Sequence, residues 1–101
     1  MYYVYVIRSK KDGMWYTGST SDLRKRFKDH NSNKVSSTKG RGPFEMIYNE
    51  ACLNEQDARA REKYLKSGMG KRYLKSRLKR FLSLTGLIYG RGKVRKYQQV
   101  F

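Results

Sequence analysis

The feature that most constrains the fold is a pair of tyrosine-bearing segments near the N-terminus, Tyr3-Val4-Tyr5 and Tyr16-Thr17-Gly18. Tyrosine and valine favour β-strands. Between the segments stands Asp12-Gly13, a pair of residues typical of tight hairpin turns. We therefore predict an antiparallel hairpin with strands over residues 2–8 and 15–19. Because a phenol can donate or accept a hydrogen bond, the hairpin would also bring two chemically useful groups close together.

The middle of the chain predicts one helix, a loop and a third strand. Thr20, Ser21 and Asp22 can cap the N-terminus of a helix over residues 23–30. Residues 31–42 are rich in Ser, Asn, Lys and Gly and are predicted to form a loop. Pro43 ends this loop, and residues 44–52 are predicted to form the third strand of the sheet.

Two more helices are predicted after the third strand. Asn54 can cap the first, which is expected to run to Lys66 and to be stopped by Gly68. The second is predicted over residues 71–82, where one face is apolar and the other basic. The resulting order ββαβαα, with one antiparallel sheet, belongs to the α/β (α+β) class and fits a single domain.

We expect the domain to span residues 1–82 and interpret residues 83–101 as a basic C-terminal tail. Three glycines, at positions 86, 90 and 92, argue against a helix in this segment. The tail is predicted either to be disordered or to add a strand around residues 87–89.

The charge balance indicates a polyanionic partner. The chain of 101 residues carries 24 Lys and Arg against 8 Asp and Glu, a formal net charge of +16. Such an excess repels itself in the folded state, and nucleic acid is the partner that best explains it. A ribosome-associated protein or a solubilising surface are the alternatives, and an anionic membrane fits less well.

Composition also limits compartment and cofactor. No apolar run approaches the roughly 20 residues of a membrane span, and no signal-peptide pattern opens the chain. One Cys and one His exclude an internal disulfide and a zinc site built from Cys and His. We therefore expect a soluble, cytoplasmic protein.

Helix phasing draws attention to three polar residues. At 100° per residue, His30 lies within about 20° of the apolar Leu23, and Arg26 lies about 60° away. Both are expected to point toward the sheet or its margin. On the next helix, Glu62 lies about 40° from the inward-facing Ala58. A carboxylate there is costly unless it is paired, hydrogen-bonded or bound to a metal.

Taken together, these residues resemble a known family. Tyr3-Val4-Tyr5, Tyr16-Thr17-Gly18, the Arg26/His30 helix and Arg61-Glu62-Lys63 are similar to the motif set of the GIY-YIG nucleases. The chain looks most like the small stand-alone GIY-YIG domain proteins of bacteria. The resemblance covers about residues 1–82, including the stretches at residues 38–44 and 70–75. Tyr3 stands where a glycine usually opens the first motif, and the asparagine that many members carry late in the domain has no clear match.

The resemblance implies a three-stranded antiparallel sheet flanked by helices and an endonuclease that hydrolyses phosphodiester bonds. DNA, including structured or damaged DNA, is the expected substrate ahead of RNA. One divalent ion, Mg²⁺ or Mn²⁺, is the implied cofactor, because hard oxygen ligands suit it. The oligomeric state is left open.

The resemblance also assigns roles to single residues. Glu62 corresponds to the metal-binding glutamate, and Arg26 to the arginine that contacts the scissile phosphate. Tyr5 and Tyr16 correspond to the motif tyrosines, one of which activates the attacking water. His30 would assist proton transfer or position the water. Gly18 would keep the strand end open for close backbone approach. Phosphate contacts are expected from Lys25, Lys39, Arg41, Lys71 and Arg72.

Each site residue also has a purely structural interpretation. The two tyrosines could be cross-strand aromatic partners, Arg26 a solvated cation and His30 a cation at a helix C-terminus. Glu62 could pair with Arg59 or Lys66 at the surface. The corresponding alternative function is a nucleic-acid-binding module in which catalysis is weak or lost.

Overall fold

The structure is a computed structural model that describes residues 1–88. It consists of two compact units, the first formed by Met1–Lys63 and the second beginning at Tyr64. Each unit is described by itself. Over the described residues, no helix combines the length and the apolar character needed to cross a bilayer.

The first unit is built on a three-stranded antiparallel sheet, as predicted. Its strands are β1 (Tyr2–Ser9), β2 (Trp15–Thr20) and β3 (Phe44–Cys52), in the spatial order β2-β1-β3. Because β1 lies between the other two strands, it contributes the buried run from Val4 to Ser9. The edge strand β2 is only partly buried along its whole length.

The hairpin turn between β1 and β2 has the chemistry that its sequence predicts. Gly13 adopts a φ of 77°, a left-handed conformation that costs glycine little. The Asp12 carboxylate accepts a hydrogen bond from the Met14 N–H, and the Ser9 N–H bonds to the Met14 carbonyl oxygen. Backbone and side chain together therefore close the turn.

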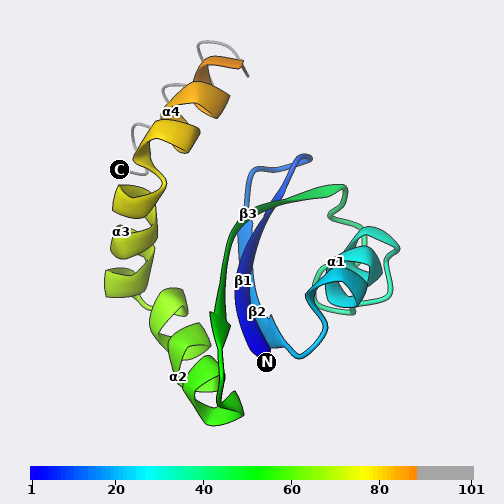
Figure 1. Ribbon diagram of the computed structural model, residues 1–101. Coiled ribbons are helices and arrows are strands. Elements are labelled where there is room, and N and C mark those ends of the chain that lie inside the picture. The colour runs from blue at the N-terminus through cyan, green and yellow to red at the C-terminus, as the bar shows by residue number, and fades with distance from the viewer. Residues whose placement is uncertain (89–101) are drawn as a thin grey trace. The chain divides into compact units, whose positions relative to one another are not determined.

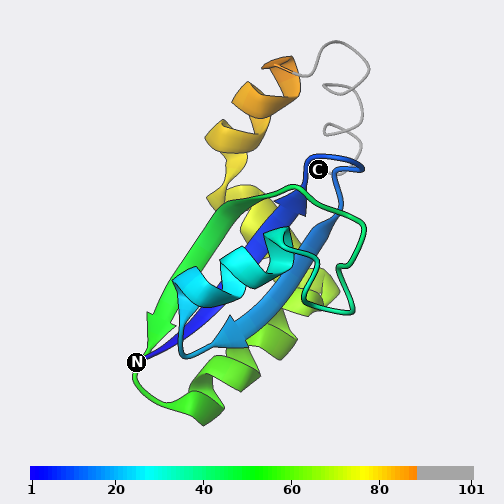
Figure 2. The same ribbon diagram turned by 90° about the vertical axis from the view of Figure 1, so that its right-hand side faces the viewer.

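Helix α1 (Leu23–Asn31) covers one face of this sheet (Figure 1 and Figure 2). Its predicted cap is present, because the Asp22 side chain accepts a hydrogen bond from the Lys25 N–H. Under α1 lies an apolar cluster whose buried members come from β1 and β3. The cluster is formed by Tyr5, Ile7 and Phe44, with Tyr16, Leu23, Phe27 and Met46 packed against it.

Helix α2 (Glu55–Lys66) begins on the opposite face of the sheet. Asn54 caps it, since its side-chain oxygen accepts from the Gln56 and Asp57 N–H groups. Within the first unit, Ala58 is buried and Arg61 donates to Glu50 of β3 at 3.0 Å. Residues 55–63 of α2 therefore face the side of the sheet that α1 leaves uncovered.

The strand register decides which side chains face which helix. Tyr5 is paired with Gly18, and Val4 with Ser19. Since successive side chains of a strand point to opposite faces, Tyr5 and Gly18 share the α1 face. Val4 and Ser19 share the α2 face. A register shift between Val6 and Ile7 interrupts the β1–β3 ladder.

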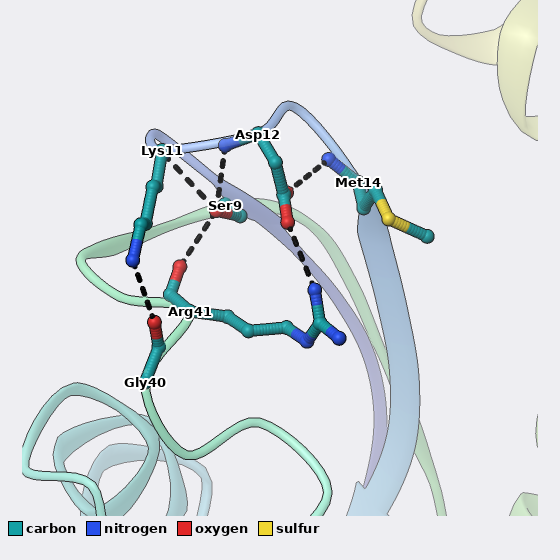
Figure 3. Close-up of polar contacts among 6 residues, drawn as sticks. All are labelled: Ser9, Lys11, Asp12, Met14, Gly40 and Arg41. Carbon is teal, nitrogen blue, oxygen red and sulfur yellow. Dashed lines mark hydrogen bonds and ion pairs between the residues drawn. The ribbon is translucent and has the colours of Figure 1, made fainter.

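The loop between α1 and β3 is tied to the β1–β2 turn (Figure 3). Ser9 donates from its hydroxyl to the Arg41 carbonyl at 2.6 Å, and Lys11 Nζ reaches the Gly40 carbonyl at 3.2 Å. Arg41 and Asp12 form an ion pair at 3.3 Å. Ser9 also accepts from the Lys11 and Asp12 N–H groups. The loop is thus held in place although it has no regular secondary structure.

The second unit corrects the predicted C-terminal helix. Instead of one helix over residues 71–82, the chain forms α3 (Gly68–Arg77) and α4 (Lys79–Ile88). Leu78 leaves the helical conformation, with a ψ of 19°, and ends α3. Leu78 is apolar, and neither Gly nor Pro marks the break, so the sequence pattern did not predict it.

Gly68 also has a role different from the predicted one. It is the first residue of α3 rather than the stop signal of α2, because Ser67 caps α3 by accepting from the Gly70 N–H. A side chain at Gly70 would overlap the Tyr64 carbonyl oxygen. The close approach of Tyr64 to the start of α3 therefore requires a glycine at position 70.

The expected tail begins inside a helix. Residues 83–88, including Gly86, belong to α4, so the predicted strand around residues 87–89 is wrong for Leu87 and Ile88. Position 89 and the rest of the expected tail lie outside the described residues. The domain boundary after residue 82 stays a prediction, and α4 runs across it.

Candidate active site

A buried pair formed by Tyr5 and His30 lies between β1 and α1. The Tyr5 hydroxyl is 2.8 Å from His30 Nε2, and the two rings meet edge to face with centroids 5.6 Å apart. Tyr5 is 2% exposed and His30 is 4% exposed. The sequence predicts that these two residues share a site, and the structure places them in direct contact.

The other ring nitrogen of His30 is also engaged. Nδ1 lies 2.8 Å from the Thr38 hydroxyl, and Thr38 is buried in the loop that precedes β3. Burial lowers the pKa of His30 below its ordinary value of 6.5, and the nearby charge of Arg26 lowers it further, while Asp29 opposes the shift. The imidazole is therefore neutral at neutral pH, unlike the helix-terminal cation considered as an alternative.

Gly18 makes room for the Tyr5 phenol. A Cβ atom at this position would lie 2.5 Å from the Tyr5 hydroxyl oxygen and 2.8 Å from Cζ. Since Tyr5 and Gly18 are cross-strand neighbours, the missing side chain leaves the space that the Tyr5 ring occupies next to β2. The group that approaches Gly18 closely is thus part of the protein's own core.

Tyr16 is more accessible than Tyr5. It is opposite Ile7 in the β1–β2 ladder, so the two motif tyrosines are not the cross-strand pair of the structural alternative. Its ring packs edge to face on Phe44, with centroids 5.7 Å apart. The side chain is half-buried, and its phenol has no hydrogen bond to any of the residues that the structure describes.

Glu62 contacts the edge strand β2 from the side of the sheet opposite to α1. Its Oε1 accepts a hydrogen bond from the Ser19 hydroxyl at 2.6 Å, so the carboxylate points toward the sheet. One candidate surface partner, Arg59, pairs instead with Glu55 at 2.9 Å. Tyr5 and His30 lie on the α1 face, whereas Glu62 approaches from the α2 side, so β2 separates the two groups.

The donor set is compatible with a divalent ion of the hard, strongly hydrated type. Among residues 1–88, no three His, Cys, Asp or Glu side chains come together as metal ligands. Glu62 would hold an ion with one carboxylate, and the rest of the coordination would come from water and phosphate. Mg²⁺ is often bound in this way, through one or two carboxylates and substrate phosphates.

Arg26 is exposed on α1, one helical turn before the buried His30, where a long side chain keeps its charge in water. Its charge is one of the causes that lower the pKa of His30, after burial.

The predicted phosphate-binding residues are exposed but fall in separate parts of the chain. Lys25 pairs with Asp29 at 3.1 Å, and Arg41 pairs with Asp12. Lys39 is exposed in the loop between α1 and β3. In the second unit, Lys71 and Arg72 are exposed on α3.

Lys75 reveals how concentrated the charge on α3 is. Burial lowers its pKa, and the neighbouring charges of Lys71 and Arg72 lower it further. Like charges at this spacing on one helix destabilise it unless an anion offsets them. This part of α3 therefore concentrates positive charge.

The fold and this site define a small α+β domain with a polar site built around the first hairpin and the helices on its two faces. Comparison with known proteins identifies the family. The model of the GIY-YIG catalytic domain matches residues 1–75, and the chain belongs to this family. GIY-YIG domains form a nuclease superfamily that generally uses a divalent metal and acts on nucleic acid.

Bacterial relatives are similar to this chain over about two thirds of its length. UPF0213 protein CPE1444 of Clostridium perfringens is 42% identical over 67 residues, which cover 65% of this chain and 71% of the relative. UPF0213 protein YazA of Bacillus subtilis is 41% identical over 66 residues, covering 64% of this chain and 66% of the relative. The solution NMR structure of UPF0213 protein BH0048 from Bacillus halodurans matches with a TM-score of 0.48 and 40% identity, covering 75% of this chain and 84% of that one.

Two residues at the site were not predicted from the sequence. Ser19 follows the second tyrosine motif directly, and its place next to Gly18 was the available signal. Thr38 lies in a polar loop without periodicity, so its contact with His30 appears only when the loop folds back over α1.

Proposed function

We propose that this protein is a divalent-metal-dependent endonuclease that hydrolyses phosphodiester bonds, with DNA as its first substrate. The observation that carries the proposal is the buried Tyr5–His30 pair. Burying two polar groups in so small a core is costly unless they are hydrogen-bonded to each other. A protein that only binds phosphates needs surface cations and has no use for this arrangement, whereas active sites commonly contain such buried titratable groups.

The accessible phenol belongs to Tyr16, and we assign to it the contact with the attacking water. Tyr5 is buried and already bonded to His30, so it is suited to hold the site in shape. A phenol is a poor base at neutral pH, and nearby positive charge has to favour its deprotonated form. Arg26, which is exposed near the buried pair, would contact the scissile phosphate and stabilise the charge that develops on it.

Glu62 is proposed as the protein ligand of one Mg²⁺ or Mn²⁺ ion. When bound, such an ion stabilises negative charge on phosphate oxygens and lowers the pKa of coordinated water. Ser19 would orient the Glu62 carboxylate, as residues behind metal ligands commonly do. Tyr16 lies on the α1 face of the partly buried edge strand β2 and Glu62 approaches from the α2 face, so the substrate backbone would have to reach both at this edge.

Substrate binding is assigned to the exposed basic residues. Lys25, Lys39, Arg41, Lys71 and Arg72 would contact phosphates, releasing counterions and making affinity fall with salt. Because this class of contact reads the backbone and not the bases, the proposal includes structured or damaged DNA and carries no sequence motif. DNA repair is a corresponding cellular role.

The test is a cleavage assay on supercoiled, branched and single-stranded DNA and on RNA, with Mg²⁺ or Mn²⁺. The proposal predicts nicking that is abolished by EDTA, by Glu62→Ala and by Arg26→Ala. Fluorescence anisotropy should show that Glu62→Ala retains nucleic-acid binding. Glu55→Ala is the matched control, because Glu55 lies on the same helix and its exposed carboxylate pairs only with Arg59 among the contacts described.

Two results would count against the proposal. Cleavage that survives Glu62→Ala would overturn the assigned metal ligand and indicate a contaminating enzyme. Binding to every substrate without cleavage of any would favour the alternative, a nucleic-acid-binding module in which catalysis is lost.

A further inference from the structure

We propose that Thr38 is a positioning residue that fixes His30 as the Nδ1–H tautomer, so that Nε2 accepts the hydrogen bond from the Tyr5 hydroxyl. The inference deepens the proposed function and rests on it for its importance to catalysis. The geometry that supports it is a chain of contacts running from Tyr5 through His30 to Thr38 and the Val35 carbonyl.

The contact between Thr38 and Val35 indicates which atoms donate along this series of contacts. The Thr38 hydroxyl lies 3.5 Å from the Val35 carbonyl oxygen, and a carbonyl can only accept. If Thr38 gives its single proton to Val35, its oxygen is left to accept from His30 Nδ1–H at 2.8 Å. His30 Nε2 then carries no proton and accepts from the Tyr5 hydroxyl, also at 2.8 Å.

The Nε2–H tautomer would leave one of the three contacts without a hydrogen bond. With Nε2 protonated, the Thr38 hydroxyl would have to donate to Nδ1. No hydrogen would then lie between the Thr38 and Val35 oxygens. Only the Nδ1–H tautomer makes all three contacts hydrogen bonds, and the neutral state of the buried ring leaves these two tautomers as the alternatives.

Thr38 is held firmly enough to act in this way. It is 1% exposed, its N–H bonds to the Val35 carbonyl at 3.1 Å, and its carbonyl accepts from the Arg41 N–H at 3.1 Å. Arg41 is in turn held by Ser9 and Asp12 of the hairpin turn, as Figure 3 shows. The turn between β1 and β2 therefore supports the loop that carries Thr38.

The other neighbours of the ring do not select a tautomer. Phe44 packs on it edge to face at 6.0 Å between centroids and offers neither donor nor acceptor. Arg26 and Asp29 on α1 act through their charges on the protonation of the ring as a whole. Selection between Nδ1–H and Nε2–H is thus left to Thr38 and Tyr5, and the contact of Thr38 with the Val35 carbonyl indicates which tautomer is present.

The test uses the fact that the chain contains a single histidine, so its ring signals need no assignment. Long-range ¹H–¹⁵N spectra of the ¹⁵N-labelled full chain, at a pH where the ring is neutral, distinguish a protonated Nδ1 from a protonated Nε2. We expect the Nδ1–H pattern in the wild type and in Thr38→Ser. In Thr38→Val, which keeps the shape and loses the hydroxyl, the Nε2–H form should increase.

A wild-type spectrum with Nε2 protonated would overturn the inference, and so would a Thr38→Val spectrum identical to that of the wild type. The wild-type measurement requires no variant, so a Thr38→Val protein that failed to fold would leave the test intact. The spectra are recorded without substrate or metal. Absence of cleavage would therefore contradict the proposed function and leave the tautomer result unchanged. In the cleavage assay, Thr38→Val should lose activity, while Thr38→Ser and the exposed control Ser37→Ala retain it.

Discussion

The Ser19 hydroxyl donates to Glu62 at 2.6 Å and joins an edge strand to a helix 43 positions further along the chain. This contact holds one oxygen of the Glu62 carboxylate at the edge strand. It comes directly after Gly18, whose missing side chain admits Tyr5 on the opposite face. Two successive residues of β2 thus support the two halves of the candidate site.

Replacing Ser19 with alanine should reduce metal-dependent cleavage, with a smaller effect on the free energy of unfolding. Loss of a residue that orients a metal ligand typically costs 10–100-fold in metal affinity or activity, and we expect about tenfold here, with a higher Mg²⁺ concentration needed for half-maximal nicking. A Mg²⁺ titration of cleavage measures both effects. Ser21→Ala is the matched control, since Ser21 is exposed nearby. Equal Mg²⁺ requirements in Ser19→Ala and wild type would contradict the role given to Ser19.

Replacing Gly18 with alanine should destabilise the protein by about 1–3 kcal/mol, because the new methyl group would overlap the Tyr5 phenol. Urea unfolding measures the change. Tyr5→Phe in the Gly18→Ala background should recover part of the loss, since it removes the nearest atom. Gly68→Ala is the control and should be tolerated, because nothing lies within 4 Å of a Cβ at that position. Purely additive effects of Gly18→Ala and Tyr5→Phe would speak against the overlap.

Stability should fall as the pH drops below about 6.5, the ordinary pKa of a histidine. The folded pKa of His30 is lowered by burial and by Arg26, so in this range the unfolded chain binds more protons than the folded one. The contribution of neutral His30 is complete above the unfolded pKa and is lost as the pH falls through the folded pKa. Urea unfolding at a series of pH values measures it.

His30→Asn is the control for this pH dependence, because it removes the only histidine. Its stability should change little between about pH 5 and 7. Asp12 and Asp29 also have lowered pKa values, chiefly through hydrogen bonds to the Met14 N–H and to Lys25, and they titrate in a more acidic range. Wild-type stability that increased on acidification toward pH 5 would show that His30 is not held in its neutral form.

Arg72→Ala should reduce the salt dependence of nucleic-acid binding. Each phosphate contact contributes about 0.9 to the slope of log K against log salt concentration, so the slope should fall by about that amount. Anisotropy titrations at several salt concentrations measure the slope. Arg59→Ala removes the same charge from an exposed arginine that already pairs with Glu55, and should change the slope less. Equal slopes for both variants would mean that α3 contributes only through net charge.

Much of the first unit could be predicted from the sequence because its signals are local. The Asp12-Gly13 turn, the Asp22 cap and the Asn54 cap each act within a few residues, and the hairpin, α1 and the start of α2 followed from them. The inward positions of His30 and Glu62 followed from the helical period. The break at Leu78 had no such signal, and the single helix predicted there was wrong.

Local sequence signals identify which residues could form a site: two tyrosines on a hairpin, a histidine at the inward end of a helix and one inward acid. How these residues pair depends on the tertiary structure. Contacts between residues far apart in the chain depend on strand register and on how loops fold back, which local propensity does not encode. Register put Gly18 against Tyr5 and Ser19 toward Glu62, and the anchored loop brought Thr38 to His30.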